Sequence, residues 1–400
     1  MTRKIDNIKI LHIIKFLSSL YFFHHVITLY FQARGLNYVQ INSLWGIIVG
    51  VQALAEVPTG IIADKIGRKY SIIIALALQF LGEFIFIFAH SYLLFVFICI
   101  IAGIGFSFLS GCFEAMMYDS LKANNKEQEM QKVAGLNGSF ALAATMIGSI
   151  IGGFITANLQ LSNFVHAIIL TAFFVLLSFL ASLLLKEPTL EYRHSEDSSF
   201  KLLKDGLNLI KTNRSLKRII ILSLLATPFI NYLLNFYPPY FVEANVSGYF
   251  FGITLAIASL LGVFTSKYAY LFEKIFGVKK GVLLAVLLPG MLYFLLAFIS
   301  HSMISIILVV LAFGTMHIQK PIFLDYLNRH IESKNRATVL SLINVISGFY
   351  VAIMGLLIGF LADVSLAYSF IFMGGLIAFG SLYIKIDDSH VTIDVNKNLC

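Results

Sequence analysis

Ionisable side chains interrupt long apolar segments of this chain, where charge is costly and usually serves a function. They include His24, His25, Glu56, Glu83, Glu114, His317 and Lys320. Histidine titrates near neutral pH, so His24 and His25 are candidates for proton coupling, together with Glu56 and Glu114. Neighbouring residues on a helix point about 100° apart, so only one of the two histidines can face a cavity squarely. The alternative for each is a histidine that only packs and hydrogen-bonds.

Glu114 and Lys320 are candidates for a gate. Two short stretches, "YDSL" at Tyr118–Leu121 and "LDYL" at Leu324–Leu327, are separated by the same interval as these two residues, so an internal repeat would superpose them. Because an unpaired buried charge is costly, we expect an ion pair that closes one side of a cavity. Alternatively, Glu114 attracts a cationic substrate and Lys320 an anionic one, or each charge is satisfied within its own half.

Polar and aromatic groups on the seventh apolar segment are candidates for a pocket. Asn231 and Asn235, with Tyr232 and Tyr237 beside them, could receive an amphipathic ligand together with Phe113 and His317. A lipid-facing aromatic surface is the alternative for any one of them, since the chain has 37 phenylalanines. Glu83 is expected to have a structural role.

The elements that position these residues are transmembrane helices. The chain is 58% hydrophobic and 12% charged, whereas soluble domains carry about 25% charged residues. A run of roughly 20 apolar residues crosses a bilayer as a helix. Twelve such segments are predicted, at residues 10–32, 41–63, 71–90, 92–118, 132–157, 163–185, 216–242, 248–272, 281–300, 303–326, 337–361 and 366–384.

The distribution of Lys and Arg predicts the topology. Nearly all of the 29 lie in the N-terminal tail, the even-to-odd loops and the C-terminal tail, which places both termini in the cytoplasm. The net charge of +8 then faces anionic inner-leaflet lipid, and no nucleic-acid partner is needed. We expect a multi-pass protein of a bacterial inner membrane.

The longest polar stretch, Lys186–Arg218, divides the chain in two. We predict an all-α membrane protein with two pseudo-symmetric six-helix bundles, residues 1–185 and 216–385, joined by a cytoplasmic linker, 186–215, and followed by a tail, 386–400. The linker has apolar residues at helical spacing, which predicts an amphipathic helix on the membrane surface. They are Phe200, Leu203, Leu207 and Ile210. "EKIFGVK" at Glu273–Lys279 also resembles "DKIGRK" at Asp64–Lys69, as a repeat would require.

"GIIADKIGRKYS" at Gly60–Ser71 resembles the signature of the major facilitator superfamily between helices 2 and 3. Gly60, Asp64, Gly67, Arg68 and Lys69 match, in the expected loop of a chain with six plus six helices. The resemblance covers the whole chain and implies a transporter that works by alternating access.

The same resemblance implies a latch on the cytoplasmic side. Asp64 would face the N-terminus of helix 11, near Ala337, and Arg68 would pair with Asp119 at the end of helix 4. Gly60 would allow close helix packing, and Gly67 would permit the tight reversal before helix 3. An ordinary basic loop that only sets topology would need neither the aspartate nor the paired glycines.

A second resemblance concerns direction. "ATMIGSIIGGF" on helix 5 partly matches the motif of the superfamily's antiporters, with Gly148, Gly152 and Gly153 retained and Ser149 in the place of proline. This favours export; a generic packing seam of small residues is the alternative. An arginine typical of proton-coupled exporters on helix 4 is replaced by Cys99, which cannot supply that fixed charge.

The leading functional prediction is a secondary active, proton-coupled exporter of small amphipathic molecules, resembling the 12-helix drug/proton antiporters. An importer or symporter of a dedicated nutrient is the alternative. A membrane sensor or lipid-modifying enzyme is a weaker one, since no nucleotide loop, metal cluster or nucleophile–base pair is evident. Cys99, Cys112 and Cys400 suggest neither disulfide nor metal. We therefore expect no enzymatic activity, no cofactor and no metal, and a monomer whose partners are the substrate, protons and the bilayer.

Overall fold

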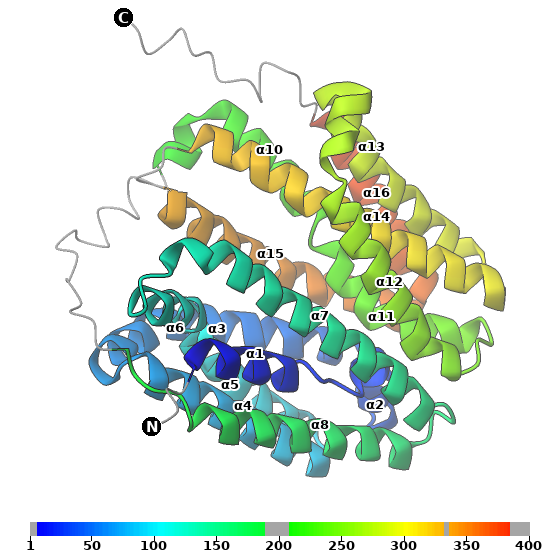
Figure 1. The fold of residues 1–400 in the computed structure, drawn as a ribbon. Coiled ribbons are helices and arrows are strands. Elements are labelled where there is room, and N and C mark those ends of the chain that lie inside the picture. Colours follow the sequence, from blue (N-terminus) through cyan, green and yellow to red (C-terminus); the bar gives the residue numbers. More distant parts are fainter. Residues whose placement is uncertain (1–5, 189–207, 332–335, 385–400) are drawn as a thin grey trace, which may run out of the picture. The chain divides into compact units, whose positions relative to one another are not determined.

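The fold was analysed in a computed structural model, which describes residues 6–188, 208–331 and 336–384. Those residues form helices joined by turns (Figure 1). The predicted all-α membrane fold is confirmed, and eleven helices of the described chain are long and apolar enough to cross a membrane. The helices are α1 (Asn7–Ser18), η1 (His24–Val26), α2 (Ile27–Ala33), α3 (Tyr38–Ile66), α4 (Arg68–Phe88), α5 (Tyr92–Leu109), α6 (Cys112–Lys122), η2 (Glu127–Glu129), α7 (Met130–Ile155), α8 (Leu161–Ser182), α10 (Arg214–Ala226), α11 (Phe229–Glu243), α12 (Tyr249–Lys267), α13 (Tyr270–Phe298), α14 (Ser302–His330), α15 (Arg336–Val364) and α16 (Leu366–Tyr383).

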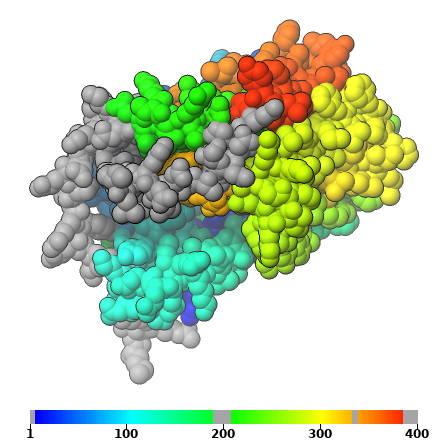
Figure 2. Space-filling model, turned by 90° about the horizontal axis from the view of Figure 1, so that it is seen from above, coloured from blue at the N-terminus to red at the C-terminus, as the bar shows by residue number. Residues whose placement is uncertain are grey.

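The chain divides into two compact units. Unit 1 comprises residues 1–193 with 247–256, and unit 2 comprises residues 194–246 with 257–400. In unit 1, α4 packs on α5 and α8, α3 packs on α5, and α1 lies between α7 and α8 (Figure 1). In unit 2, α13 packs on α14 and α16; Figure 2 shows α16, in red, against the yellow-green α13.

The first predicted transmembrane segment is not one continuous helix. Residues 10–32 were expected to form it, but α1 ends at Ser18 and regular helix resumes only at His24. No proline or glycine marks this break in the sequence. Backbone groups that a break exposes inside a membrane must find partners in the protein or line a cavity. Here the backbone N–H of Phe22 donates to the Thr171 hydroxyl on α8 at 3.1 Å.

Two glycines of α7 make room for this break. A Cβ at Gly152 would lie 1.9 Å from the carbonyl oxygen of Phe22, and one at Gly148 would lie 2.7 Å from that of Tyr21. Neither position can hold a larger residue while the break keeps its place, because such distances are far below van der Waals contact. The glycines of the helix-5 motif therefore seat the broken first helix. Gly153 packs instead against Gly252 of α12, within unit 1.

Some predicted features lie outside the described residues. These are most of the linker 186–215, including the part of its amphipathic helix before residue 208, and the tail 386–400. Helix α15 begins at Arg336, close to the predicted start of helix 11. The side chain of Ala337 is not among those described.

Candidate functional site

A cavity of about 440 Å³ lies within unit 1. Its wall is formed by α3, α4 and α5 on one side and by the broken first segment on the other, with Thr145 of α7 completing it. Most of the wall is apolar, and much of it is aromatic. The aromatic lining residues are Tyr21, Phe23, Phe31, Trp45, Phe86 and Phe106. Such a wall suits a ligand with apolar and aromatic parts.

Helix α4 supplies two of the polar residues that line the cavity. Gln79 and Glu83 are four residues apart on this helix, so they lie on the same face. The Gln79 amide donates to the Tyr21 hydroxyl at 2.8 Å, and Glu83 interacts with the same hydroxyl. The Glu83 atom Oε2 is buried and has no hydrogen-bond partner among the described residues. Burying a carboxylate oxygen without a partner is energetically costly. We therefore expect a proton or a ligand to bind at this oxygen.

Two ring nitrogens on the cavity wall are also buried without a hydrogen-bond partner among the described residues. His24 stacks on Trp45 with ring centroids 6.5 Å apart and planes inclined by 17°. His24 Nε2 and Trp45 Nε1 are both buried and lack a hydrogen-bond partner within the described chain. Because η1 resumes the chain at His24, the break is what aims this ring at the cavity.

His25 points to a different neighbour. It is fully buried, and its Nε2 lies 2.9 Å from the Thr156 hydroxyl just beyond α7. The structure thus places His24 on the cavity wall and His25 in the packing against α7. A role in proton coupling stays a prediction for both.

Sequence reasoning did not select Glu83, Gln79, Tyr21 or Trp45 for the site. From the sequence, Glu83 was expected to have a structural role. The signal that could have found it is the spacing of Gln79 and Glu83, two polar residues one turn apart in the apolar part of α4 that follows Ser71. Tyr21 reaches the cavity only because of the break in the first segment.

The turn between α3 and α4 carries a cluster of charges, which we call the unit 1 cluster: Asp64, Arg68 and Glu187. Gly67 has φ 92° and ψ 168°, a conformation that is essentially restricted to glycine. The Glu187 carboxylate accepts hydrogen bonds from the backbone N–H groups of Arg68 and Lys69, both at 2.7 Å. This carboxylate caps the positive N-terminus of α4. Arg68 also pairs with Asp64 at 3.6 Å.

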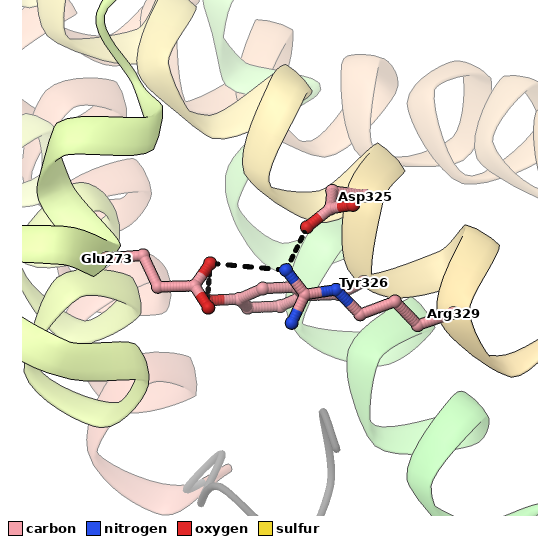
Figure 3. Close-up of polar contacts among 4 residues, drawn as sticks. All are labelled: Glu273, Asp325, Tyr326 and Arg329. Atoms are coloured by element: carbon pink, nitrogen blue, oxygen red, sulfur yellow. Dashed lines mark hydrogen bonds and ion pairs between the residues drawn. The ribbon is translucent and has the colours of Figure 1, made fainter. Parts of the chain in front are cut away.

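The corresponding turn in unit 2 lies inside α13, at Gly277, with φ 72° and ψ 169°. Figure 3 shows the charges beside it, which we call the unit 2 cluster: Glu273, Asp325, Tyr326 and Arg329. Arg329 bridges two carboxylates, at 2.5 Å from Asp325 and 3.5 Å from Glu273. The Tyr326 hydroxyl donates to Glu273 at 3.4 Å. This cluster was not predicted from the sequence, although the glycine turn and Asp325 belong to the repeat.

The remaining predicted residues do not lie in the cavity of unit 1. Glu56 and Glu114 are exposed in unit 1 but do not line that cavity, and Asp119 is buried. Gly60 has no described atom within 4 Å of where a Cβ would stand. In unit 2, Lys320 and Asn231 are exposed, Asn235 is buried, and His317 packs on Gly262. The Glu114–Lys320 pair would join the two units and stays a prediction.

Comparison with known proteins identifies the fold. A family model described as Major Facilitator Superfamily matches residues 11–349. The uncharacterized MFS-type transporter YxaM of Bacillus subtilis (strain 168) is 21% identical over 341 residues, which are 84% of this chain and 83% of that protein.

Solved structures show the same fold at low sequence identity. A variant of the nucleoside transporter NupG has a TM-score of 0.77 at 14% identity, covering 94% of this chain and 98% of that one. A D-xylose–proton symporter has a TM-score of 0.70 at 14% identity, covering 94% of this chain and 97% of that one.

Proposed function

The chain belongs to the Major Facilitator Superfamily of membrane transporters, and on this premise we propose that it exports small amphipathic molecules in exchange for protons. Membership makes it a multi-pass membrane protein and a secondary transporter with a small-molecule substrate, not an enzyme. The direction of transport, the coupling ion and the substrate class are the parts that we propose.

The observation that carries the proposal is the cavity of unit 1. Its aromatic wall offers apolar contact, and Glu83, with a buried and unpartnered carboxylate oxygen, is part of its lining. A molecule with an apolar body and one polar or charged group would satisfy both parts. Export is supported by the partial match of helix 5, with Gly148 and Gly152, to the motif of the superfamily's antiporters.

We further propose that the unit 1 and unit 2 clusters lie on the cytoplasmic side. The distribution of Lys and Arg supports this orientation, with both termini in the cytoplasm of a bacterial inner membrane. Asp64 would then contact the N-terminus of α15 when the cytoplasmic side is closed and lose that contact when it opens. A single chain contains the whole cavity, so a monomer would suffice for transport.

Import of a dedicated nutrient is the second candidate. It is supported by the solved proteins of the same fold, whose titles describe a nucleoside transporter and a D-xylose–proton symporter. A nutrient with many hydroxyl groups would need more polar partners than the mostly apolar cavity of unit 1 provides. The geometry therefore favours an amphipathic substrate over a sugar.

The test is cellular accumulation in an efflux-deficient bacterium that expresses the wild type, Asp64→Asn or Glu127→Gln at equal levels. Glu127 is an exposed residue of η2 and serves as the matched control. The panel contains lipophilic cations, neutral dyes, antibiotics, nucleosides and pentoses. We expect the wild type and Glu127→Gln to lower the accumulation of amphipathic compounds, and Asp64→Asn to abolish this effect.

Two results would contradict the proposal. Increased accumulation of a nucleoside or pentose would support the importer instead. Lowered accumulation that persists after a protonophore collapses the proton gradient would exclude protons as the coupling ion.

A further inference from the structure

We propose that Glu83 binds the positively charged group of an amphipathic organic cation, and that this cation and a proton occupy its carboxyl group in alternation. The proposal rests on the proposed function for the direction of transport, but the binding site itself does not depend on that direction.

The first observation is the unfilled position at the carboxyl group. Tyr21 holds Glu83 from the broken segment, yet Oε2 is buried without a hydrogen-bond partner among the described residues. None of the ion pairs within the described chain involves Glu83. A carboxyl group in such a place is either protonated and neutral, or ionised and paired with a cation.

The second observation is the chemistry of the surrounding wall. Tyr21, Phe23, Phe86 and Trp45 line the same cavity as Glu83. Aromatic faces attract organic cations through their quadrupoles, and the attraction is larger where water is excluded. A carboxylate that shares a cavity with aromatic rings therefore favours an ammonium or phosphonium group that carries apolar substituents.

The third observation concerns the other ionisable groups that face the cavity. They are Lys15, Tyr21, His24 and Cys99. The ammonium group of Lys15 lies 6.0 Å from the centre of the Phe113 ring, so it is engaged on the α6 side. Protonation of Glu83 removes the negative charge that would hold a cation, and any proton taken up by His24 would add positive charge beside it. The affinity for a cation should therefore rise with pH.

These properties define an exchange at one carboxyl group. When the cation binds the protonated site, Glu83 releases one proton and forms an ion pair with the cation. When a proton returns, the carboxyl group becomes neutral and the cation leaves. Each step conserves charge and transfers one proton, so the site would couple one cation to one proton.

The chain contains a built-in probe of this site. Trp45 is the single tryptophan among 400 residues, and it lines the cavity. Intrinsic tryptophan fluorescence of the purified full-length protein therefore reports on this cavity without any added label. We would titrate the protein with tetraphenylphosphonium, with benzyltrimethylammonium, and with tetraphenylborate, which has the shape of the first probe and the opposite charge.

For the wild type, we expect a saturable response to at least one of the two cations and at least tenfold weaker binding of tetraphenylborate. The cation affinity should rise as the pH is raised from 5 to 8, and binding in a weakly buffered solution should release protons. Glu83→Gln should weaken cation binding at least tenfold and remove both the pH dependence and the proton release. Glu83→Asp, which keeps the charge, should retain the pH dependence at reduced affinity. Glu127→Gln should behave as the wild type.

Tritiated tetraphenylphosphonium provides a second readout that does not depend on Trp45, and the thermal unfolding midpoint of each variant checks that it is folded. Absence of cation binding to the wild type in both assays would overturn the proposal. Equal affinity of folded Glu83→Gln, or equal affinity for tetraphenylborate, would overturn it as well.

The outcomes separate this site from the proposed function. Binding with proton release, combined with unchanged cellular accumulation, would keep the site and reject export. Lowered accumulation of cations that is the same for Glu83→Gln and the wild type would keep export and reject the site.

Discussion

The turns at Gly67 and Gly277 have nearly the same backbone conformation but are fastened in different ways. At Gly67, a carboxylate from beyond α8 caps the following helix, and the arginine of the turn pairs with an aspartate one helical turn earlier. At Gly277, the turn contains no arginine, and Arg329 at the end of α14 bridges Glu273 and Asp325 instead. The two units thus share the backbone conformation of the turn, but the charged residues beside it come from different elements in each unit.

The feature that both turns share is the glycine. Both turns need glycine because φ is positive and ψ is close to 170°, where other residues are strained. The arginine can come from either the turn or a neighbouring helix end, because a guanidinium group reaches carboxylates from several directions. We therefore expect the two turns to respond differently to the loss of each part.

The largest effect is expected for Gly67→Ala compared with Gly277→Ala. Both substitutions force a strained backbone, at a cost of roughly 1–3 kcal/mol. At Gly67 the new Cβ would also lie 2.8 Å from the Glu187 carboxyl group, whereas no described atom lies within 4 Å of a Cβ at Gly277. Thermal unfolding of the purified variants should show a larger fall in midpoint for Gly67→Ala. Equal falls would mean that the Glu187 contact adds nothing.

The next effect is that of Glu187→Gln. A glutamine can accept only one of the two backbone hydrogen bonds and carries no charge, so we expect a loss of about 1–2 kcal/mol. Glu127→Gln is the matched control, since Glu127 is exposed and outside the cluster. The same substitution should cost less in a Gly67→Ala background, because the alanine already displaces the carboxylate. Strict additivity would contradict the proposed coupling.

A smaller effect is expected in the unit 2 cluster. Arg329→Ala removes a bridge whose side chains are about one third to one half exposed, and such pairs contribute about 1 kcal/mol or less. Combining Arg329→Ala with Glu273→Gln should show that the two losses are not additive in thermal unfolding. Lys274→Ala, which removes an exposed cation next to Glu273 in α13, should leave the midpoint unchanged. An equal fall for Lys274→Ala would indicate a general charge effect.

Much of the fold could be predicted from the sequence, because hydropathy and helix length are local properties. The all-α membrane fold, the superfamily and the role of Gly67 as a turn are of this kind. The break after Ser18 could not be predicted, because it depends on Thr171 and on the absence of side chains at Gly148 and Gly152. These groups are distant in sequence, and the segment itself contains no proline or glycine that would indicate a break.

The candidate site was less predictable for the same reason. Glu83 acquires its neighbours from the break, since Tyr21 and His24 reach the cavity only where the first helix is interrupted. The Glu187 cap likewise joins residues that are more than one hundred positions apart. Local patterns identify residue types that could act, whereas the cavity and the cap arise from contacts between distant segments.

The smallest effect on stability is expected for Asp64→Asn. The Asp64 side chain is 59% exposed and lies 3.6 Å from Arg68, so losing its charge should change the unfolding free energy by less than about 0.5 kcal/mol. Transport should nevertheless be lost if Asp64 contacts α15 in the closed state, as proposed. Paired measurements of the unfolding midpoint and of cellular accumulation test this directly. If the variant transports normally, Asp64 only pairs with Arg68 at the surface and has no role in gating. If the variant is stable but does not transport, the charge of Asp64 is needed for gating.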